Sequence, residues 1–245
     1  MVEFKGLSAS SFAFMQEMKA NNNTLWFQEN RERWEALKEE LRTLCRALAP
    51  FIHDLDPELE TEPKSSRCLG RINRDTRFSK DKSPYRDFID LLFFPRDFGR
   101  SKAPGLAVGI TAENCYIGTW LGASMESWRE RLGANIAAKS DIFQQYLEEN
   151  ANFSDMWIDS QSYAKTRVKG LPPLAHQWAQ RKFYYMGRLV PGEQAVAMGA
   201  SLFQEVQNTF LRLFPLLTFA TSQHLAADLE RFRKKLPSKG DHRTK

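Results

Sequence analysis

The first quarter of the chain has apolar residues at the three- and four-residue spacing of amphipathic helices. A helix is predicted to begin after Ser8, which is a good N-cap. The three asparagines at 21–23 predict a turn and the cap of the next helix. An apolar stripe over residues 26–52 predicts one long helix, which Pro50 ends or kinks near its last turn.

In the middle of the chain the pattern changes to the alternation that is typical of β-strands. Between residues 68 and 77, Cys68, Gly70 and Ile72 alternate with mostly polar residues, which predicts a strand with one polar face. Three further strands are predicted over residues 88–94, 106–111 and 115–121, and residues 112–114 fit a tight hairpin connection. These strands predict a central, largely antiparallel sheet.

The second half of the chain returns to helical spacing, with strands in between. Helices are predicted over residues 125–138 and 142–149, after Pro172, and over 195–213 and 216–236, the last two separated at Pro215. Strands are predicted over residues 163–168 and 182–190. This order indicates an α+β fold in one domain, residues 1–236, with the N- and C-terminal helices packed on the sheet. Residues 237–245 are predicted to form a flexible basic tail.

Composition restricts the class of protein without identifying a function. Hydrophobic residues make up 42% and charged residues 27% of the chain, which excludes collagen-like and wholly disordered proteins. Apolar runs are far shorter than the roughly 18 residues of a membrane helix, and no signal peptide is visible. Cys45, Cys68 and Cys115 are widely spaced, so no disulfide framework is expected. We expect a cytoplasmic protein with no metal, no cofactor and no membrane partner.

The positive charge of the chain is concentrated in three segments, although the formal net charge is only +5. Residues 64–86 carry eight Lys or Arg residues and two Asp residues. Residues 160–192 carry six Lys or Arg residues and no acidic residue. Residues 231–245 carry seven Lys or Arg residues and one Asp residue. If the first two segments meet in space, they form a positive basin that attracts anions. Alternatively, acidic helices neutralise them by ion pairing.

The densest group of polar side chains lies in the first of these segments. On a strand, Arg71, Asp75 and Arg77 point to one face, where the carboxylate orients the two guanidinium groups. The planar fork of arginine suits phosphate or carboxylate oxygens, and lysine adds a point charge. The sequence therefore predicts a preorganised anion site made of Arg71, Arg74, Asp75, Arg77, Lys82 and Tyr85. The alternative is an internal network in which the acidic residues neutralise the arginines and the aromatic residues only pack.

Other residues are candidates to complete this site. Four of the six basic residues of the second segment are candidates, namely Lys165, Arg167, Arg181 and Lys182, and a solvated surface explains them equally well. The stretch 118–122, with Gly at both ends and Trp120 in its middle, suits close approach of a ligand to the backbone or a tight sheet edge. Cys68 has arginine neighbours that favour a nucleophilic thiolate, but its place on the apolar strand face favours a buried core thiol.

The same segment resembles the signature of a known protein family. The pattern Arg-x-x-Arg-Asp-x-Arg-Phe, followed by Asp-Lys and Tyr, lies within residues 71–85. It is similar to the core motif of a bacterial family catalogued as domain of unknown function 2461, and the stretches 4–7, 21–27 and 181–184 also look like family features. The resemblance covers most of the chain and implies a shared fold, with no established activity. Asn73 and the pair Arg86-Asp87 depart from the family pattern and alter the fine shape of any pocket.

The sequence contains no motif of a common catalytic class. P-loop, GxGxxG, GxSxG and HExxH patterns are absent, and the four histidines are scattered. The leading hypothesis is a protein whose cationic cleft binds a phosphorylated or otherwise anionic small molecule. If it is an enzyme, phosphate-ester chemistry suits these groups best, with Lys82 or Tyr85 as proton-transfer candidates.

Two other classes of function remain open. Aromatic residues accompany the basic ones at Phe78, Tyr85 and 183–185, as in proteins that bind single-stranded nucleic acid without catalysis. A third hypothesis is a protein-interaction module whose basic face meets an acidic partner.

Overall fold

The first helices begin at the capping residues that the sequence predicts. In the computed structural model, which describes residues 3–100, 103–122, 126–165 and 169–235, the first helix is α1 (Ala9–Ala20). The hydroxyl oxygen of Ser8 accepts a hydrogen bond from the Ser11 amide at 3.2 Å. Helix α2 (Thr24–Glu29) follows Asn23, whose Oδ1 accepts from the Trp26 amide at 3.0 Å. Both caps are therefore confirmed.

The long helix predicted from residue 26 is divided in two. Helix α3 (Arg31–Leu55) is separated from α2 at Asn30, whose side chain donates to the Trp26 carbonyl oxygen at 3.0 Å. This side-chain bond satisfies a carbonyl at the end of α2, so the chain can change direction there. Pro50 lies inside α3 and does not end the helix, which continues to Leu55.

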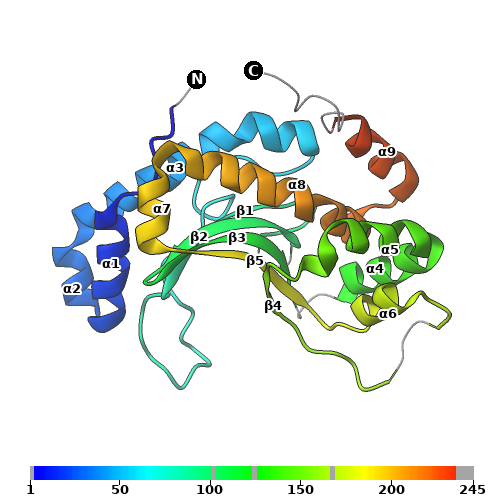
Figure 1. Ribbon diagram of the computed structural model, residues 1–245. Helices are drawn as coiled ribbons and strands as arrows, with labels where there is room; N and C mark the ends of the chain where they lie inside the picture. Colours follow the sequence, from blue (N-terminus) through cyan, green and yellow to red (C-terminus); the bar gives the residue numbers. More distant parts are fainter. Residues whose placement is uncertain (1–2, 101–102, 123–125, 166–168, 236–245) are drawn as a thin grey trace.

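The sheet has five strands, and all neighbouring strands are antiparallel. Their order is β1-β2-β3-β5-β4, and Figure 1 shows them in the centre of the molecule. The strands are β1 (Phe88–Phe93), β2 (Gly105–Thr111), β3 (Asn114–Leu121), β4 (Trp157–Asp159) and β5 (Tyr184–Pro191). The predicted mostly antiparallel sheet and the β2–β3 hairpin are confirmed.

Two predicted strands are wrong. Only residues 68–70 lie beside β1, through Gly70 N to Asp90 O at 2.7 Å and Leu92 N to Cys68 O at 2.9 Å. Residues 71–87 leave the sheet as a loop, because exposed charged side chains dominate this stretch and it has little apolar surface to bury. Residues 163–165 also form no strand, and residues 166–168 lie outside the described residues. Instead, the short strand β4 forms the edge of the sheet next to β5.

The remaining helices agree with the predicted order, except around Gly199 and Pro215. They are α4 (Glu126–Ala138), α5 (Ser140–Glu149), α6 (Pro173–Ala179), α7 (Gly192–Met198), α8 (Leu202–Thr221) and α9 (Leu225–Lys235), with 3-10 turns at Ala151–Phe153 and Gly199–Ser201. The predicted helix 195–213 is interrupted by a 3-10 turn at Gly199–Ser201. Pro215 was expected to separate two helices but lies inside α8. The residues on both sides of Pro215 are buried, and this packing opposes the roughly 3 kcal/mol that proline costs in a helix interior. The Tyr146 hydroxyl also donates to the Arg212 carbonyl oxygen at 2.8 Å.

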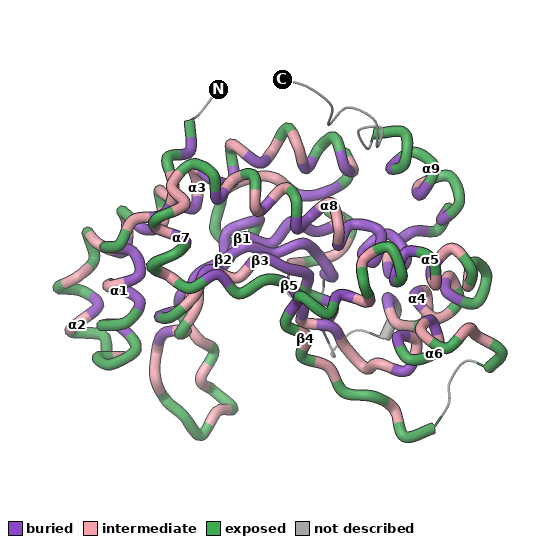
Figure 2. The backbone as a smooth tube through the Cα atoms, in the orientation of Figure 1, coloured by how far each residue is buried: buried purple, intermediate pink, exposed green. Residues whose placement is uncertain are grey.

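One face of the sheet is covered by helices and the other is open. Helices α3 and α8 lie over the first face (Figure 1), and Figure 2 shows the buried positions concentrated in this sheet and in α8. Phe210 on α8 meets Phe93 on β1 with ring centroids 5.9 Å apart. Loops border the opposite face. No helix in the described part of the chain combines the length and apolar character needed to cross a bilayer. The tail 237–245 lies outside the described residues.

Candidate ligand-binding face

The arginine-rich motif lies on one projecting loop, residues 71–87, which we call the motif loop. Its two ends are held together like the base of a hairpin. Asn73 pairs with Tyr85 in an isolated bridge, and the Arg74 amide donates to the Pro84 carbonyl oxygen at 2.8 Å. The Arg86 amide donates to the Ile72 carbonyl oxygen, also at 2.8 Å. The loop is therefore closed by backbone hydrogen bonds although it lies outside the sheet.

Two of the three predicted clamp arginines are paired inside the motif loop. The Asp75 carboxylate accepts from Arg77 Nε at 2.9 Å and Nη2 at 2.7 Å, and this pair lowers the pKa of Asp75 to about 2. Asp81 accepts from Ser83 and from Arg74, and these hydrogen bonds lower its pKa. Arg71 forms no ion pair with any described residue. Arg74 and Arg77 thus follow the internal-network alternative.

The two predicted proton-transfer candidates hold the loop in place. The Tyr85 ring is 6% exposed and stacks on Phe27, with centroids 4.1 Å apart. Lys82 Nζ donates to the Thr76 carbonyl oxygen at 2.9 Å. Both side chains thus have structural contacts that need no reaction, and the catalytic role remains a prediction.

The predicted site residues of the second basic segment do not join the motif loop, although Arg188 of that segment lines a hollow on the sheet together with Asp87. The loop and α6 lie toward opposite ends of the sheet (Figure 1), so Arg181 and Lys182 do not complete a single basin with the motif loop. The Arg181 guanidinium lies 4.9 Å from the Trp178 ring, and Lys182 Nζ lies 5.6 Å from the Tyr163 ring. Lys165 is exposed, and Arg167 lies outside the described residues.

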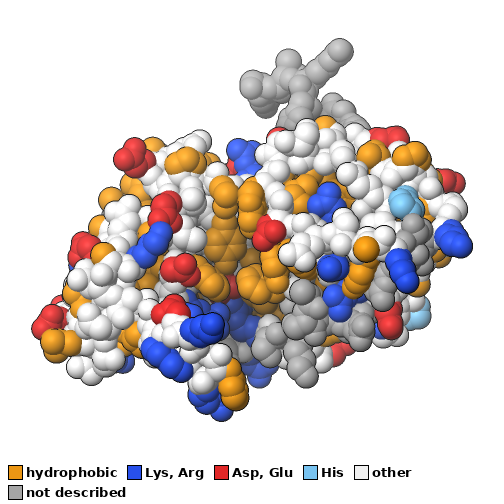
Figure 3. All heavy atoms as spheres, turned by 90° about the horizontal axis from the view of Figure 1, so that it is seen from below, with side chains coloured by type: hydrophobic (Ala, Val, Ile, Leu, Met, Phe, Trp, Pro, Cys, Tyr) orange, Lys and Arg blue, Asp and Glu red, His pale blue; other side chains and the backbone are white. Residues whose placement is uncertain are grey.

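The open face of the sheet is hollowed into an apolar groove of about 370 Å³. Figure 3 shows hydrophobic side chains gathered in this hollow, with Lys and Arg side chains beside it. Trp120 on β3 and Tyr185 on β5 lie in its wall with ring centroids 4.7 Å apart. The exposed fractions are 37% for Trp120, 47% for Trp157 and 45% for Leu189. The groove thus presents large apolar side chains that folding has not fully buried.

Two glycines keep the floor of the groove free of side chains. Gly118 on β3 faces Gly187 on β5 in the antiparallel register. A Cβ on Gly118 would lie 2.1 Å from the Met186 carbonyl oxygen, and one on Gly187 would lie 2.0 Å from that of Ile117. Only glycine allows the two strands to approach this closely. The stretch 118–122 noted in the sequence therefore contributes both a floor glycine and Trp120.

The groove continues to the motif loop. Asp87 and Phe88 line the groove and also an open hollow of about 560 Å³ that Arg74, Tyr85 and Arg86 share. The Arg86 guanidinium lies 5.5 Å from the Phe88 ring. Among the described residues Arg86 has no carboxylate within ion-pair distance, so an unpaired cation lines the second hollow beside Asp87 and Phe88.

A buried polar cluster supports this junction from within. Arg100 Nη2 donates to the Asp90 carboxylate at 2.7 Å, and both side chains are largely buried. Burial raises the pKa of Asp90, while Arg100 and Arg86 oppose this shift. Burial also raises the pKa of Tyr116, whose hydroxyl has no hydrogen-bond partner among the described residues. Sequence reasoning missed this cluster, because the three side chains come from β1, the next loop and β3.

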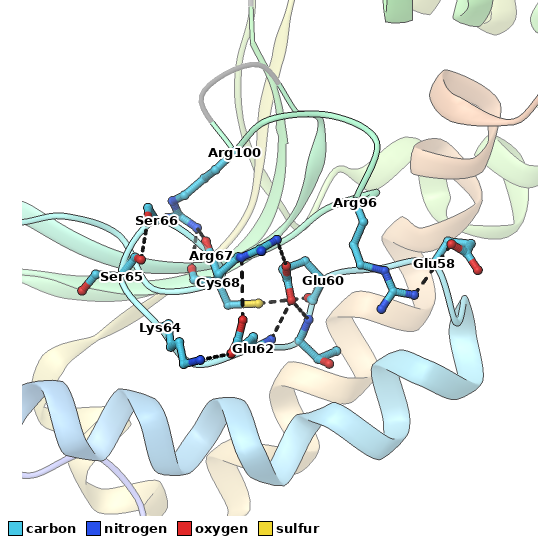
Figure 4. Close-up of polar contacts among 11 residues, drawn as sticks. Glu58, Glu60, Glu62, Lys64, Ser65, Ser66, Arg67, Cys68, Arg96 and Arg100 are labelled. Carbon is cyan, nitrogen blue, oxygen red and sulfur yellow. Dashed lines mark hydrogen bonds and ion pairs between the residues drawn. The ribbon is translucent and has the colours of Figure 1, made fainter.

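The segment before the motif loop is a structural network (Figure 4). Its buried Glu60 carboxylate accepts from the Thr61 and Glu62 amides at 3.0 and 2.9 Å and from Arg67 at 3.1 Å. The Cys68 thiol donates to the Glu60 carbonyl oxygen at 2.9 Å. Burial raises the pKa of Cys68, so it is a protonated core thiol and not a nucleophile. Within the described ranges, no three His, Cys, Asp or Glu side chains gather to hold a metal ion.

Comparison with known proteins gives a family and no activity. A family model described as "Conserved hypothetical protein (DUF2461)" matches residues 10–219, a range that includes the motif loop and the whole sheet. No curated protein matches the chain. The family match confirms the resemblance found in the sequence.

Proposed function

The chain belongs to the DUF2461 family of conserved hypothetical proteins, and we propose that it binds a small anionic molecule with an apolar or aromatic body. The body lies in the groove on the open sheet face, and the anionic group lies at the junction with the motif loop. The observation that carries this proposal is that Asp87 and Phe88 line both hollows, and that Arg86 lines the second hollow beside them. One ligand can therefore contact apolar surface and a guanidinium group together.

The chemistry of the two parts is complementary to such a ligand. Aromatic side chains such as Trp120 and Tyr185 offer large apolar area and stack against planar groups. The guanidinium of Arg86 presents a planar fork to phosphate or carboxylate oxygens. Asp87 stands at the same junction, so a hydroxyl or amino group next to the anionic group would complement it. A phosphorylated small molecule with a ring system meets all of these conditions.

A pair of fluorescent probes tests the proposal on the intact chain. 8-Anilinonaphthalene-1-sulfonate carries an aromatic body and an anionic group, while N-phenyl-1-naphthylamine has the same body without charge. We expect the sulfonate to bind at least tenfold more tightly, because only it can use Arg86, and we expect inorganic phosphate alone to displace it weakly. Equal affinity for the two probes would contradict a joint apolar and anionic site.

Matched variants locate the binding. Arg86→Gln is expected to weaken binding of the sulfonate probe and to leave the affinity for the neutral probe unchanged. Leu189→Ser, in the groove, is expected to weaken binding of both probes. The control is Leu25→Ser on α2, because Leu25 is 67% exposed and lies outside the groove. Near-ultraviolet circular dichroism confirms that each variant is folded. Identical binding in all three variants would place the probes elsewhere and refute the proposal.

Single-stranded nucleic acid is the second candidate occupant. The rings of Phe183 and Tyr185 lie 5.1 Å apart next to Trp120, which resembles a stacking platform on an antiparallel sheet. Fluorescence anisotropy with a short oligothymidylate separates the two candidates. Nucleic-acid binding predicts that the oligomer binds far more tightly than a mononucleotide and weakens steeply from 50 to 200 mM salt, in proportion to the phosphates contacted. Similar affinity for both favours the small molecule.

A further inference from the structure

A pair of arginines at the other end of the sheet lines a separate hollow of about 260 Å³. Arg129 lies on α4 and Arg181 follows α6, and neither borders the groove. We propose that this hollow, the arginine pocket, binds a phosphate-type oxyanion, either free or as the phosphate group of a monoester. The inference does not rest on the function proposed for the groove. It differs from the single basin expected from the sequence, because Arg181 joins Arg129 and not the motif loop.

Arg181 is a partly buried cation without an acidic partner in the described structure. Its guanidinium lies 4.9 Å from the Trp178 ring and 5.9 Å from the Tyr184 ring. Burial lowers the pKa of Arg181, and no carboxylate opposes that shift. A desolvated guanidinium gains strongly from an anion that restores its hydrogen bonds.

Arg129 lines the same pocket and carries a donor without a partner. Its Nη1 donates to the Lys182 carbonyl oxygen at 3.2 Å, which holds the side chain against the segment after α6. Its Nε is buried and has no partner among the described residues. Buried donors of this kind are almost always satisfied by protein, water or ligand. Glu130 also lines the hollow but is exposed and forms no ion pair with either arginine.

Arg212 shows how this protein stabilises a similar arginine when no ligand is involved. Its guanidinium lies 5.6 Å from the Phe153 ring, as Arg181 lies against Trp178. Arg212 also donates to both carboxylate oxygens of Asp155, at 2.8 and 2.9 Å. The arginine pocket has the aromatic support without such a carboxylate. In the proposal, an oxyanion takes the place beside Arg129 and Arg181 that the Asp155 carboxylate takes beside Arg212.

Titration with inorganic phosphate tests the pocket directly. Calorimetry and thermal unfolding are measured at constant ionic strength, with sodium chloride as the ionic control and O-phosphoserine as the monoester. We expect phosphate to raise the melting temperature beyond the chloride control. Tighter binding of phosphoserine than of phosphate would identify the monoester as the better ligand, and the reverse would identify the free ion. No shift beyond chloride for either compound overturns the proposal.

Three substitutions and a matched control assign the site. Arg181→Lys and Arg129→Lys are each expected to weaken phosphate binding at least tenfold, because lysine lacks the planar fork. Arg212→Lys keeps the pocket and is expected to retain wild-type phosphate affinity. Ala134→Glu, an exposed α4 residue that lines the pocket, supplies an internal carboxylate. This variant should remain folded and lose the phosphate response. Unchanged phosphate binding in both lysine variants and in Ala134→Glu overturns the assignment.

Discussion

The side-chain amide of Asn22 forms two hydrogen bonds with the backbone of Tyr85. Its Nδ2 donates to the Tyr85 carbonyl oxygen at 3.0 Å, and its Oδ1 accepts from the Tyr85 amide at 3.0 Å. Five residues later in the sequence, Phe27 stacks on the Tyr85 ring. Asn22, in the turn between α1 and α2, therefore holds the backbone of Tyr85, and Phe27 on α2 holds its ring. Together they fix the base of the motif loop. Asn22 is a positioning residue for the loop.

Loss of the Asn22 amide should loosen the motif loop without unfolding the protein. In Asn22→Ala the Tyr85 backbone groups lose both partners, and we expect the free energy of unfolding to fall by about 1–3 kcal/mol. Amide hydrogen exchange over residues 71–86 should become faster than in the wild type. Urea denaturation and exchange mass spectrometry measure the two effects.

Asn21→Ala is the control for that experiment. The Asn21 side chain donates to the Glu17 carbonyl oxygen within the exposed end of α1 and does not reach the loop. Exchange over residues 71–86 should remain at the wild-type rate in this variant. Equal exchange rates in both variants would show that Asn22 does not hold the loop.

The elements that sequence reasoning predicted well are those with a local cause. Ser8 and Asn23 cap their helices by contacts within three residues, and the β2–β3 hairpin follows from alternation and a short turn. Pro215 was misjudged because the cost of proline is local, whereas the burial that outweighs it is tertiary. Strand β4, with three residues, is too short to show a period.

Breaking the buried Asp90–Arg100 pair should be strongly destabilising. Asp90→Ala leaves the Arg100 guanidinium without its carboxylate in a largely buried position, and such uncompensated charges cost about 3–5 kcal/mol. Glu39→Ala is the comparison, because Glu39 pairs with Arg42 and Arg46 on the exposed side of α3. Exposed pairs contribute about 0.2–1 kcal/mol, so its free energy of unfolding should change little. Similar urea midpoints for both variants would contradict the interior role of Asp90.

The candidate site was predicted in part, for a physical reason. The density of arginine in residues 71–86 located the motif loop, but sequence does not say which carboxylate meets which guanidinium. Asp81 lies seven residues from Arg74 and becomes its neighbour only because the loop folds back. The groove could not be predicted without the register of β3 and β5, which places Gly118 opposite Gly187. The run of asparagines signalled a turn, and its contact with Tyr85 is visible only in three dimensions.

The glycine floor of the groove should not tolerate a methyl group. In Gly118→Ala the new Cβ would lie 2.1 Å from the Met186 carbonyl oxygen, so β3 and β5 must separate. We expect a loss of about 1–3 kcal/mol, the usual cost of overpacking. Gly99→Ala is the control, since nothing lies within 4 Å of a Cβ there, and its stability should stay within about 0.5 kcal/mol of the wild type. Thermal and urea unfolding of both variants measure the difference.

The ionisation of Asp75 reports whether Arg77 is engaged in solution. The hydrogen bonds from Arg77 lower the pKa of Asp75 to about 2, below the value of about 3.9 for an unfolded chain. Because the folded pKa is the lower one, the contribution of this pair is complete above about pH 4 and is lost as the pH falls toward 2. In Arg77→Gln we expect the pKa of Asp75 to rise toward the ordinary value.

Carboxyl carbon NMR resolves that titration between pH 1.5 and 6. Arg71→Gln is the matched control, because Arg71 belongs to the same loop and forms no ion pair with any described residue. The pKa of Asp75 should stay near its wild-type value in this variant. High salt should reduce the difference in the pKa of Asp75 between the two variants, because the Asp75–Arg77 pair is exposed and therefore screened. An equal rise in both variants would mean that the general charge of the loop, and not the Arg77 contact, sets the ionisation of Asp75.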